Sequence, residues 1–215
     1  MEARQKLVTA FQGVFKNNSK ENIRVFFAPG RVNLIGEHTD YNGGYVFPAA
    51  LTIGTYMAVR PREDGYFQLA SSSFRQQVSF HQTDLTYKEE DDWGNYPKGV
   101  LFELQKQGIT LGGADIYYLG HIPNGAGLSS SASIGMVTAY GFAQLLEADI
   151  SKVELAKLCQ RMENQFIGVN SGIMDQFAVG LGKKRLCSFL EYEQSSVRSG
   201  SASVGSLQNC RNKYE

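Results

Sequence analysis

The order of apolar patterns along this chain of 215 residues predicts an α+β fold with a mixed or antiparallel sheet. Runs typical of strands come first, at about 45–60, 66–70 and 76–80. Helical patterns then cluster together, at 95–107, 129–146 and 151–163. A doubly wound fold would instead alternate strands and helices regularly, so we expect one sheet backed by helices.

The remaining expected elements follow from local spacing. Residues 2–16 form an apolar helical face and predict an amphipathic first helix. The apolar run 23–27 predicts a buried strand, and 114–119 predicts a later one. Residues 61–65 form a turn in which Asp64-Gly65 is a hairpin signal, which favours pairing of the strands on either side.

Composition excludes several classes of function. With 21 basic and 21 acidic residues the net charge is zero, which argues against a nucleic-acid or anionic membrane partner. The three cysteines are widely spaced and include no Cys-x-x-Cys pair, which argues against a disulfide framework and a zinc site. The chain shows neither a signal peptide nor a membrane span, so we expect a cytoplasmic protein.

A dense polar motif follows the first expected strand. Residues 28–42 read APGRVNLIGEHTDYN and combine a cation, two carboxylates and an imidazole, a mixture that no apolar core requires. Sites are usually built where a strand enters a loop. Residues 30–42 resemble the galactokinase signature of the GHMP family of small-molecule kinases. The resemblance implies the N-terminal domain of that family, with the ribosomal protein S5 domain 2-like fold.

A second motif lies between the strand at 114–119 and the next helix. Gly125 and Gly127 can adopt positive φ and allow the backbone to approach an anion closely. The free amides at the start of the following helix favour phosphate. Taken alone, the segment would more often be a glycine-containing turn capped by serine. It resembles the second GHMP motif, and this implies that the ATP triphosphate is wrapped by Gly125, Ala126, Gly127, Leu128, Ser129, Ser130 and Ser131. The Ser131 hydroxyl is then also expected to help hold Mg²⁺.

Two downstream carboxylates complete the candidate chemistry. Glu163 ends the helix at 151–163 and by itself would be an ordinary surface carboxylate. The segment from Glu163 to Asp175 resembles the family segment that supplies a Mg²⁺ ligand and the catalytic aspartate, which implies these roles for Glu163 and Asp175. A sugar hydroxyl is a poor nucleophile, so it needs a carboxylate to accept its proton and a cation to stabilise the transferring phosphoryl group. Asp175 and Arg31 are the candidates.

The resemblance also assigns sugar contacts. They are Glu37, His38, Thr39, Asp40, Gly172 and Asp175, because carboxylates can accept from neighbouring hydroxyls. In isolation His38 would be a structural histidine, but it stands among acidic residues. Ser71 is a weaker candidate for an adenosine contact.

The implied activity is ATP-dependent phosphorylation of D-galactose to galactose 1-phosphate, the first committed step of galactose catabolism. Galactose, ATP and Mg²⁺ are the expected ligands, and the full-length form is expected to be monomeric. The alternatives are an N-acetylgalactosamine kinase and a non-catalytic galactose- and ATP-binding sensor or fragment.

The resemblance covers residues 1–184 and then stops. The resemblance implies that family members continue with a second domain, which we expect this chain to lack. Residues 185–215 contain seven serines and little periodicity, so we expect a divergent, disordered tail. We interpret the chain as the N-terminal portion of a truncated or frame-shifted member, weakly active or inactive by itself.

Overall fold

The structure is a computed structural model that describes residues 2–16, 22–36, 44–123, 125–182, 186–193 and 196–203. Its helices are α1 (Glu2–Val14), α2 (Asn95–Lys106), α3 (Ser130–Leu145), α4 (Lys152–Arg161) and α5 (Met174–Leu181). A 3₁₀ turn, η2 (Glu89–Gly94), precedes α2, and a π-helical turn, η3 (Met162–Ile167), continues α4. The strands are β1 (Arg24–Asn33), β2 (Tyr45–Val46), β3 (Pro48–Arg62), β4 (Tyr66–Ser71), β5 (Val78–His81), β6 (Gly113–Gly120), β7 (Leu186–Glu193) and β8 (Ser196–Ser203).

The strands form one mixed sheet in the order β2-β7-β3-β6-β4-β5, with β1 paired to β3 and β8 paired to β7. The β4 and β6 pair is parallel, and the other pairs are antiparallel. The expected α+β fold with a mixed sheet is therefore confirmed.

The expected hairpin at Asp64-Gly65 is wrong. The turn itself forms, since Asp64 accepts from the amide of Tyr66 and Gly65 has a φ of +74°. However, β6 lies between β3 and β4, so the two strands that flank the turn do not pair. Residues 113–118 of β6 are all buried, and a strand covered on both faces takes a central place in a sheet. Burial, rather than local turn chemistry, decided the pairing.

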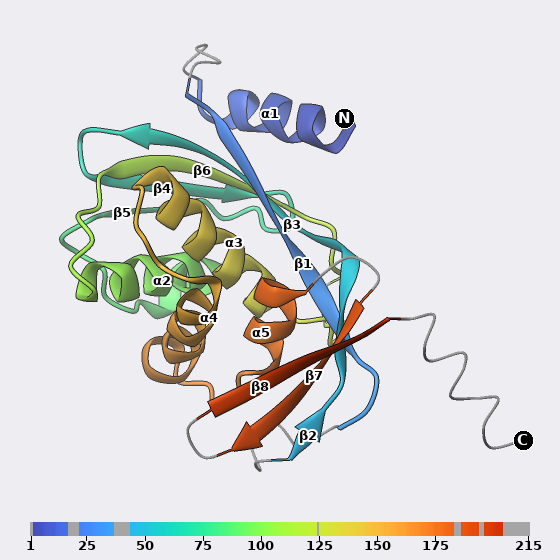
Figure 1. Cartoon of the computed structure of the whole chain (residues 1–215). Helices are drawn as coiled ribbons and strands as arrows, with labels where there is room; N and C mark the ends of the chain where they lie inside the picture. The colour runs from blue at the N-terminus through green and yellow to red at the C-terminus, as the bar shows by residue number, and fades with distance from the viewer. Residues whose placement is uncertain are drawn as a thin grey trace, which may run out of the picture.

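Helices α2 to α5 lie together on one face of the sheet, and α1 crosses the other face (Figure 1). The larger core includes Val100 of α2, Met136 of α3, Leu158 of α4 and Phe177 of α5. On the opposite face, the apolar side of α1 packs against the sheet. The residues of that smaller core are Leu7, Phe11, Phe15, Ala58, Ala70 and Tyr117.

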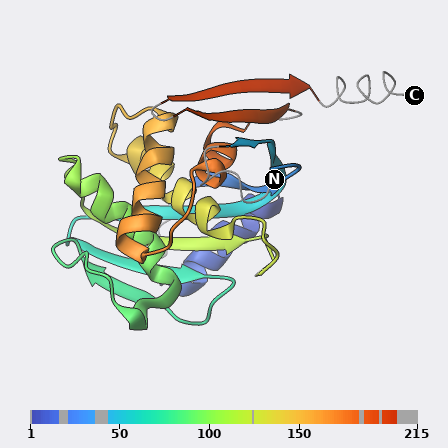
Figure 2. The same ribbon diagram turned by 90° about the horizontal axis from the view of Figure 1, so that it is seen from below.

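The structure also differs from the expectation of a disordered tail after residue 184. Strands β7 and β8 form a hairpin at the edge of the molecule, as Figure 2 shows. Backbone pairing needs no particular side chain, and residues 186–192 are rich in apolar and aromatic residues. The serines of the tail favoured disorder, whereas the apolar and aromatic residues of this run favour a strand. Residues 204–215 lie outside the described part.

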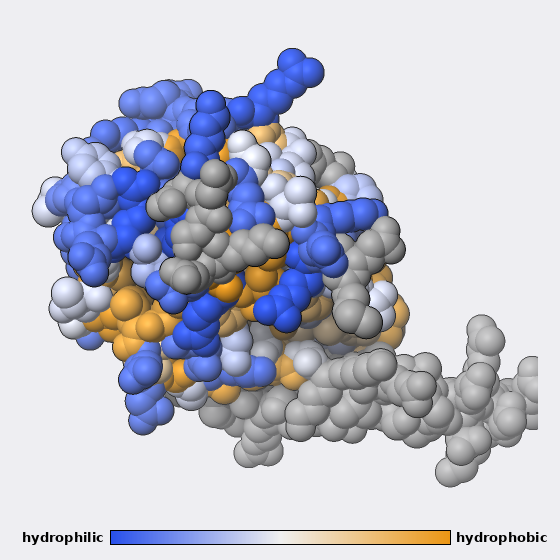
Figure 3. Space-filling model, turned by 90° about the horizontal axis from the view of Figure 1, so that it is seen from above, coloured by the Kyte–Doolittle hydropathy of each residue, from blue (hydrophilic) through white to orange (hydrophobic). Residues whose placement is uncertain are grey.

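The surface mixes hydrophilic and hydrophobic side chains (Figure 3). The exposed large apolar residues include Leu34, Ile35 and Tyr45. Leu34 and Ile35 directly follow the end of β1. Backbone hydrogen bonds tie Leu34 and Ile35 to Phe47. Within the described residues, none of the helices has the length and apolar character needed to span a membrane.

Candidate active site

The end of β1 and the start of α5 bring Arg31 and Asp175 together. The Nε and Nη2 atoms of Arg31 each lie 2.7 Å from Oδ1 of Asp175. The hydroxyl of Ser129 donates to Oδ2 at 2.5 Å. The side chains of Arg31 and Asp175 are 15% and 26% exposed, so this pair is preorganised and still open to a substrate.

Arg31 also links β1 to the glycine-rich loop, the segment before α3 that contains Gly125 and Gly127. Its Nη1 donates to the carbonyl of Gly127 at 2.5 Å, and its amide donates to the carbonyl of Leu128 at 3.2 Å. Gly125 and Gly127 have φ values of +73° and +67°, so the expected positive φ at both glycines is present. The guanidinium and the loop therefore form one unit with Asp175.

Ser129 has a role that the sequence did not suggest. Helix α3 begins at Ser130, and Ser129 is its N-cap in the left-handed region, with a φ of +58°. Its hydroxyl makes no capping bond and donates to Asp175 instead. The first amides of α3 therefore receive no side-chain cap from it, as an anion-binding helix start requires.

A buried serine anchors α3 beneath the loop. The hydroxyl of Ser133 donates to the carbonyl of Ala28 at 3.0 Å and lies 3.0 Å from Oγ1 of Thr55. The amide of Thr55 donates to the same hydroxyl at 3.2 Å. These bonds fix the start of α3 against β1 and β3.

Glu163 lies in the π-helical turn η3 and is only 5% exposed, which excludes an ordinary surface carboxylate. Its Oε2 accepts from the Ser171 hydroxyl at 3.0 Å, while its Oε1 has no hydrogen-bond partner among the described residues. Burial raises the pKa of Glu163, and the charge of Asp175 raises it further. Ser171, Ser131 and Gln176 act in the opposite direction and lower this pKa.

The Glu163 environment fits a hard cation. A buried carboxylate oxygen without a partner is costly unless an ion or water meets it. Ser131 lies close enough to Glu163 to influence its pKa, so a hydroxyl oxygen and a carboxylate oxygen are adjacent. The described residues contain no group of three or more His, Cys, Asp or Glu side chains that could hold a metal by themselves. Mg²⁺ usually takes one or two protein ligands together with phosphates and waters.

The other predicted positions divide into two groups. Glu37, His38, Thr39 and Asp40 lie outside the described residues. Gly172 is half-buried in the segment before α5, three residues from Asp175. Gly125, Ala126 and Gly127 are exposed on the loop, and Ser130 is exposed at the first position of α3.

An aromatic hollow adjoins the loop and was not predicted. Phe74 and Trp93 stack there with ring centroids 5.7 Å apart and an interplanar angle of 8°. Ser71, Ser130 and Ser131 line the same hollow, so it opens onto the start of α3. The three serines are sequence candidates, Ser71 for adenosine and the other two for the phosphates, whereas Phe74 and Trp93 are not. Stacking between residues from separate segments leaves no short motif.

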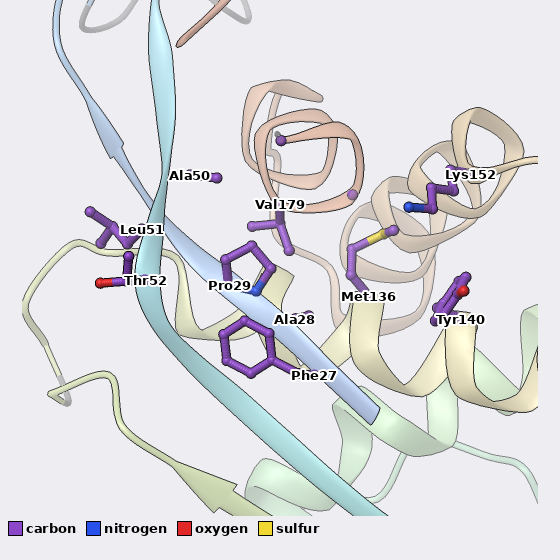
Figure 4. A pocket seen from close by; sticks show the side chains of 12 residues that line it. Phe27, Ala28, Pro29, Ala50, Leu51, Thr52, Met136, Tyr140, Lys152 and Val179 are labelled. Atoms are coloured by element: carbon purple, nitrogen blue, oxygen red, sulfur yellow. The ribbon is translucent and has the colours of Figure 1, made fainter. Parts of the chain in front are cut away.

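A larger cavity of about 380 Å³ lies between β1, β3, α3 and α5. Figure 4 shows Phe27, Pro29, Met136 and Val179 around it, with Lys152 at one side. None of the residues that line it is Arg31, Asp175 or Glu163. The polar chemistry therefore belongs to the loop and not to this apolar cavity.

Two family profiles match the chain. Residues 9–61 match the galactokinase galactose-binding signature, and residues 95–183 match the GHMP kinases N terminal domain. A mevalonate kinase from Methanococcus jannaschii shares the fold, with a TM-score of 0.70 at 20% identity over 86% of this chain and 57% of that one. The fold and the glycine-rich loop therefore define the N-terminal domain of a GHMP kinase.

Comparison with individual proteins identifies the branch of the GHMP kinase family. The galactokinase of Halalkalibacterium halodurans is 61% identical over 196 residues, which cover 89% of this chain and 50% of that protein. The galactokinase of Bacillus subtilis is 51% identical over 90% of this chain and 51% of its own length. The Lactococcus lactis galactokinase complexed with galactose has a TM-score of 0.86 and 39% identity, covering 92% of this chain and 51% of that one. The chain belongs to the galactokinase branch of the GHMP kinase family, and it spans about half the length of these relatives.

Proposed function

We propose that this chain carries the phosphate-binding and proton-accepting half of a galactokinase, which transfers the γ-phosphoryl group of ATP to the C1 hydroxyl of D-galactose. The observation that carries the proposal is the joining of Arg31, Asp175 and Ser129 at the glycine-rich loop. The galactose-binding signature and the galactose complex of the Lactococcus lactis relative support the choice of sugar.

In this proposal Asp175 accepts the proton of the sugar hydroxyl as that oxygen attacks the phosphoryl group. Arg31, held against Asp175 and the loop carbonyl of Gly127, stabilises the negative charge that develops on the phosphoryl oxygens. Both groups are already placed by β1, α5 and the loop, so little reorganisation is needed at the moment of reaction.

The loop and the aromatic hollow together suit ATP. The positive-φ glycines and the first amides of α3 offer donors to phosphate, and the stacked rings of Phe74 and Trp93 suit a planar base. Glu163 and Ser131 would hold Mg²⁺, which neutralises phosphate charge when bound. The unpartnered Oε1 of Glu163 supports this assignment.

The sugar-binding roles of Glu37, His38, Thr39, Asp40, Gly172 and Asp175 remain part of the proposal. So does the location in the cytoplasm. The activity of the whole protein is likewise a proposal, because the chain spans only about half the length of its relatives.

A chimera tests the proposal. Residues 1–182 of this chain are joined to the remaining half of the Halalkalibacterium halodurans galactokinase, and ADP formation is measured with galactose and with N-acetylgalactosamine. We expect galactose-dependent turnover, with a higher kcat/KM for galactose. A folded chimera that phosphorylates neither sugar would refute the proposal, and a preference for the acetamido sugar would establish the alternative kinase.

A further inference from the structure

Gln176 is a buried polar side chain whose polar atoms have no hydrogen-bond partner among the described residues. It follows Asp175 on α5 and is 0% exposed. Neither its Nε2 nor its Oε1 has a hydrogen-bond partner in the described part of the chain. An apolar side chain of the same size would avoid this desolvation penalty, so packing alone gives no reason for an amide here.

The other amide side chains nearby behave differently. Asn164 accepts from the amide of Ser171 at 3.0 Å and donates to its carbonyl at 3.2 Å. Gln160 donates to the same carbonyl at 3.3 Å. These amides hold the segment between η3 and α5 in place, whereas Gln176 takes no part in that network.

Gln176 lies near the carboxylate of Glu163, whose Oε1 is equally unpartnered among the described residues. The Gln176 amide lies close enough to lower the pKa of Glu163, although it forms no hydrogen bond of ordinary length and angle with that carboxylate. An amide N–H and a carboxylate oxygen are complementary, so a small side-chain rotation would join them. The same carboxylate is also close to Ser131, the other residue proposed to hold the cation.

We propose that Gln176 is a positioning residue for the cation site. Its Nε2 donates to Oε1 of Glu163 and fixes the rotation of that carboxylate for ligation, while its Oε1 accepts from a water molecule of the cation's shell. This inference rests on the proposed function, because it assumes that Glu163 holds the cation. Loss of a hydrogen bond to a ligating side chain typically weakens metal affinity about 10–100-fold.

Binding of Mn²⁺ to the 215-residue chain in the presence of ADP, followed by electron paramagnetic resonance, tests the inference. Gln176→Met keeps the size of the side chain and removes its polar atoms. Gln105→Met is the matched control, since Gln105 is exposed on α2 and donates only to the carbonyl of Gln82 among the described residues. We expect Gln176→Met to weaken Mn²⁺ binding 10–100-fold, with ADP affinity in the absence of metal unchanged. The control should bind Mn²⁺ like the unsubstituted chain.

Glu163→Gln tests the cation site independently of the role of Gln176. If Glu163→Gln weakens Mn²⁺ binding and Gln176→Met does not, the role of Gln176 is wrong and the cation site stands. If neither substitution has an effect, or the unsubstituted chain binds no Mn²⁺ with ADP, the cation site and this inference fail together.

A second measurement covers a Gln176→Met variant that does not fold. In the unsubstituted, ADP-bound chain, the side-chain amide resonances of Gln176 should shift when Mg²⁺ is added. Unchanged resonances at saturating Mg²⁺ would overturn the inference.

Discussion

Replacing Glu163 by glutamine should stabilise the protein at neutral pH while removing a proposed cation ligand. The carboxylate is 5% exposed, and its Oε1 is unpartnered among the described residues. Burial raises its pKa above the ordinary 4.5, so the folded chain holds the proton more tightly than the unfolded chain. The stabilising contribution of the protonated group is therefore present below about pH 4.5 and is lost as pH rises through the raised folded pKa.

Glutamine keeps the shape and removes the charge. At pH 7 we expect Glu163→Gln to increase the free energy of unfolding by about 1–2 kcal/mol, the order of the penalty for an unsatisfied buried acceptor. For a domain of this size that corresponds to a rise in Tm of about 2–8 °C. The increment should disappear near pH 4, where Glu163 is protonated.

Thermal unfolding without divalent cations measures the change in stability caused by Glu163→Gln at pH 7 and at pH 4. Glu154→Gln is the control, because Glu154 lies on the surface of α4 and pairs only with Lys157 in the described structure; its substitution should change stability by less than about 0.5 kcal/mol. A Glu163→Gln chain that is less stable at pH 7, or equally stabilised at both pH values, would refute the reasoning.

The remaining predictions concern activity. In the active chimera, Asp175→Asn should lower kcat by about 10² or more with KM changed little, and near-normal turnover of a folded variant would contradict its role as base. Arg31→Ala should lower kcat by a similar factor of about 10², because it acts on the developing charge. Ser131→Ala should raise the Mg²⁺ concentration needed for half-maximal rate while leaving galactose affinity unchanged.

Local sequence was a good guide to elements and to the loop. The helix expected at 95–107 is α2, and the strand at 114–119 is β6 with one residue more at each end. The loop glycines have the expected positive φ, because φ preference is a property of the residue itself. The family resemblance also paired Arg31 with Asp175 across most of the chain.

Features that depend on contacts between distant segments could not be predicted from the sequence. The position of β6 between β3 and β4 follows from burial on both faces, which the Asp64-Gly65 turn does not report. The hydroxyl of Ser129 makes no capping bond and donates instead to Asp175, which lies far away in the sequence. The stacking of Phe74 on Trp93 likewise joins two segments that neither motif contains.

The place of β6 also shapes how the protein must fold. Thr55 is registered against Gly120 and Arg62 against Gly113, so the inner edge of β3 cannot be satisfied until the chain has been made well past α2. On its other side, β6 is the parallel partner of β4, a pairing that requires a long crossover. Such non-local pairing is slow and leaves strand edges open in the meantime. During synthesis, β3 and β4 therefore pass through an interval in which a chaperone or a second nascent chain can compete with β6 for the same edges.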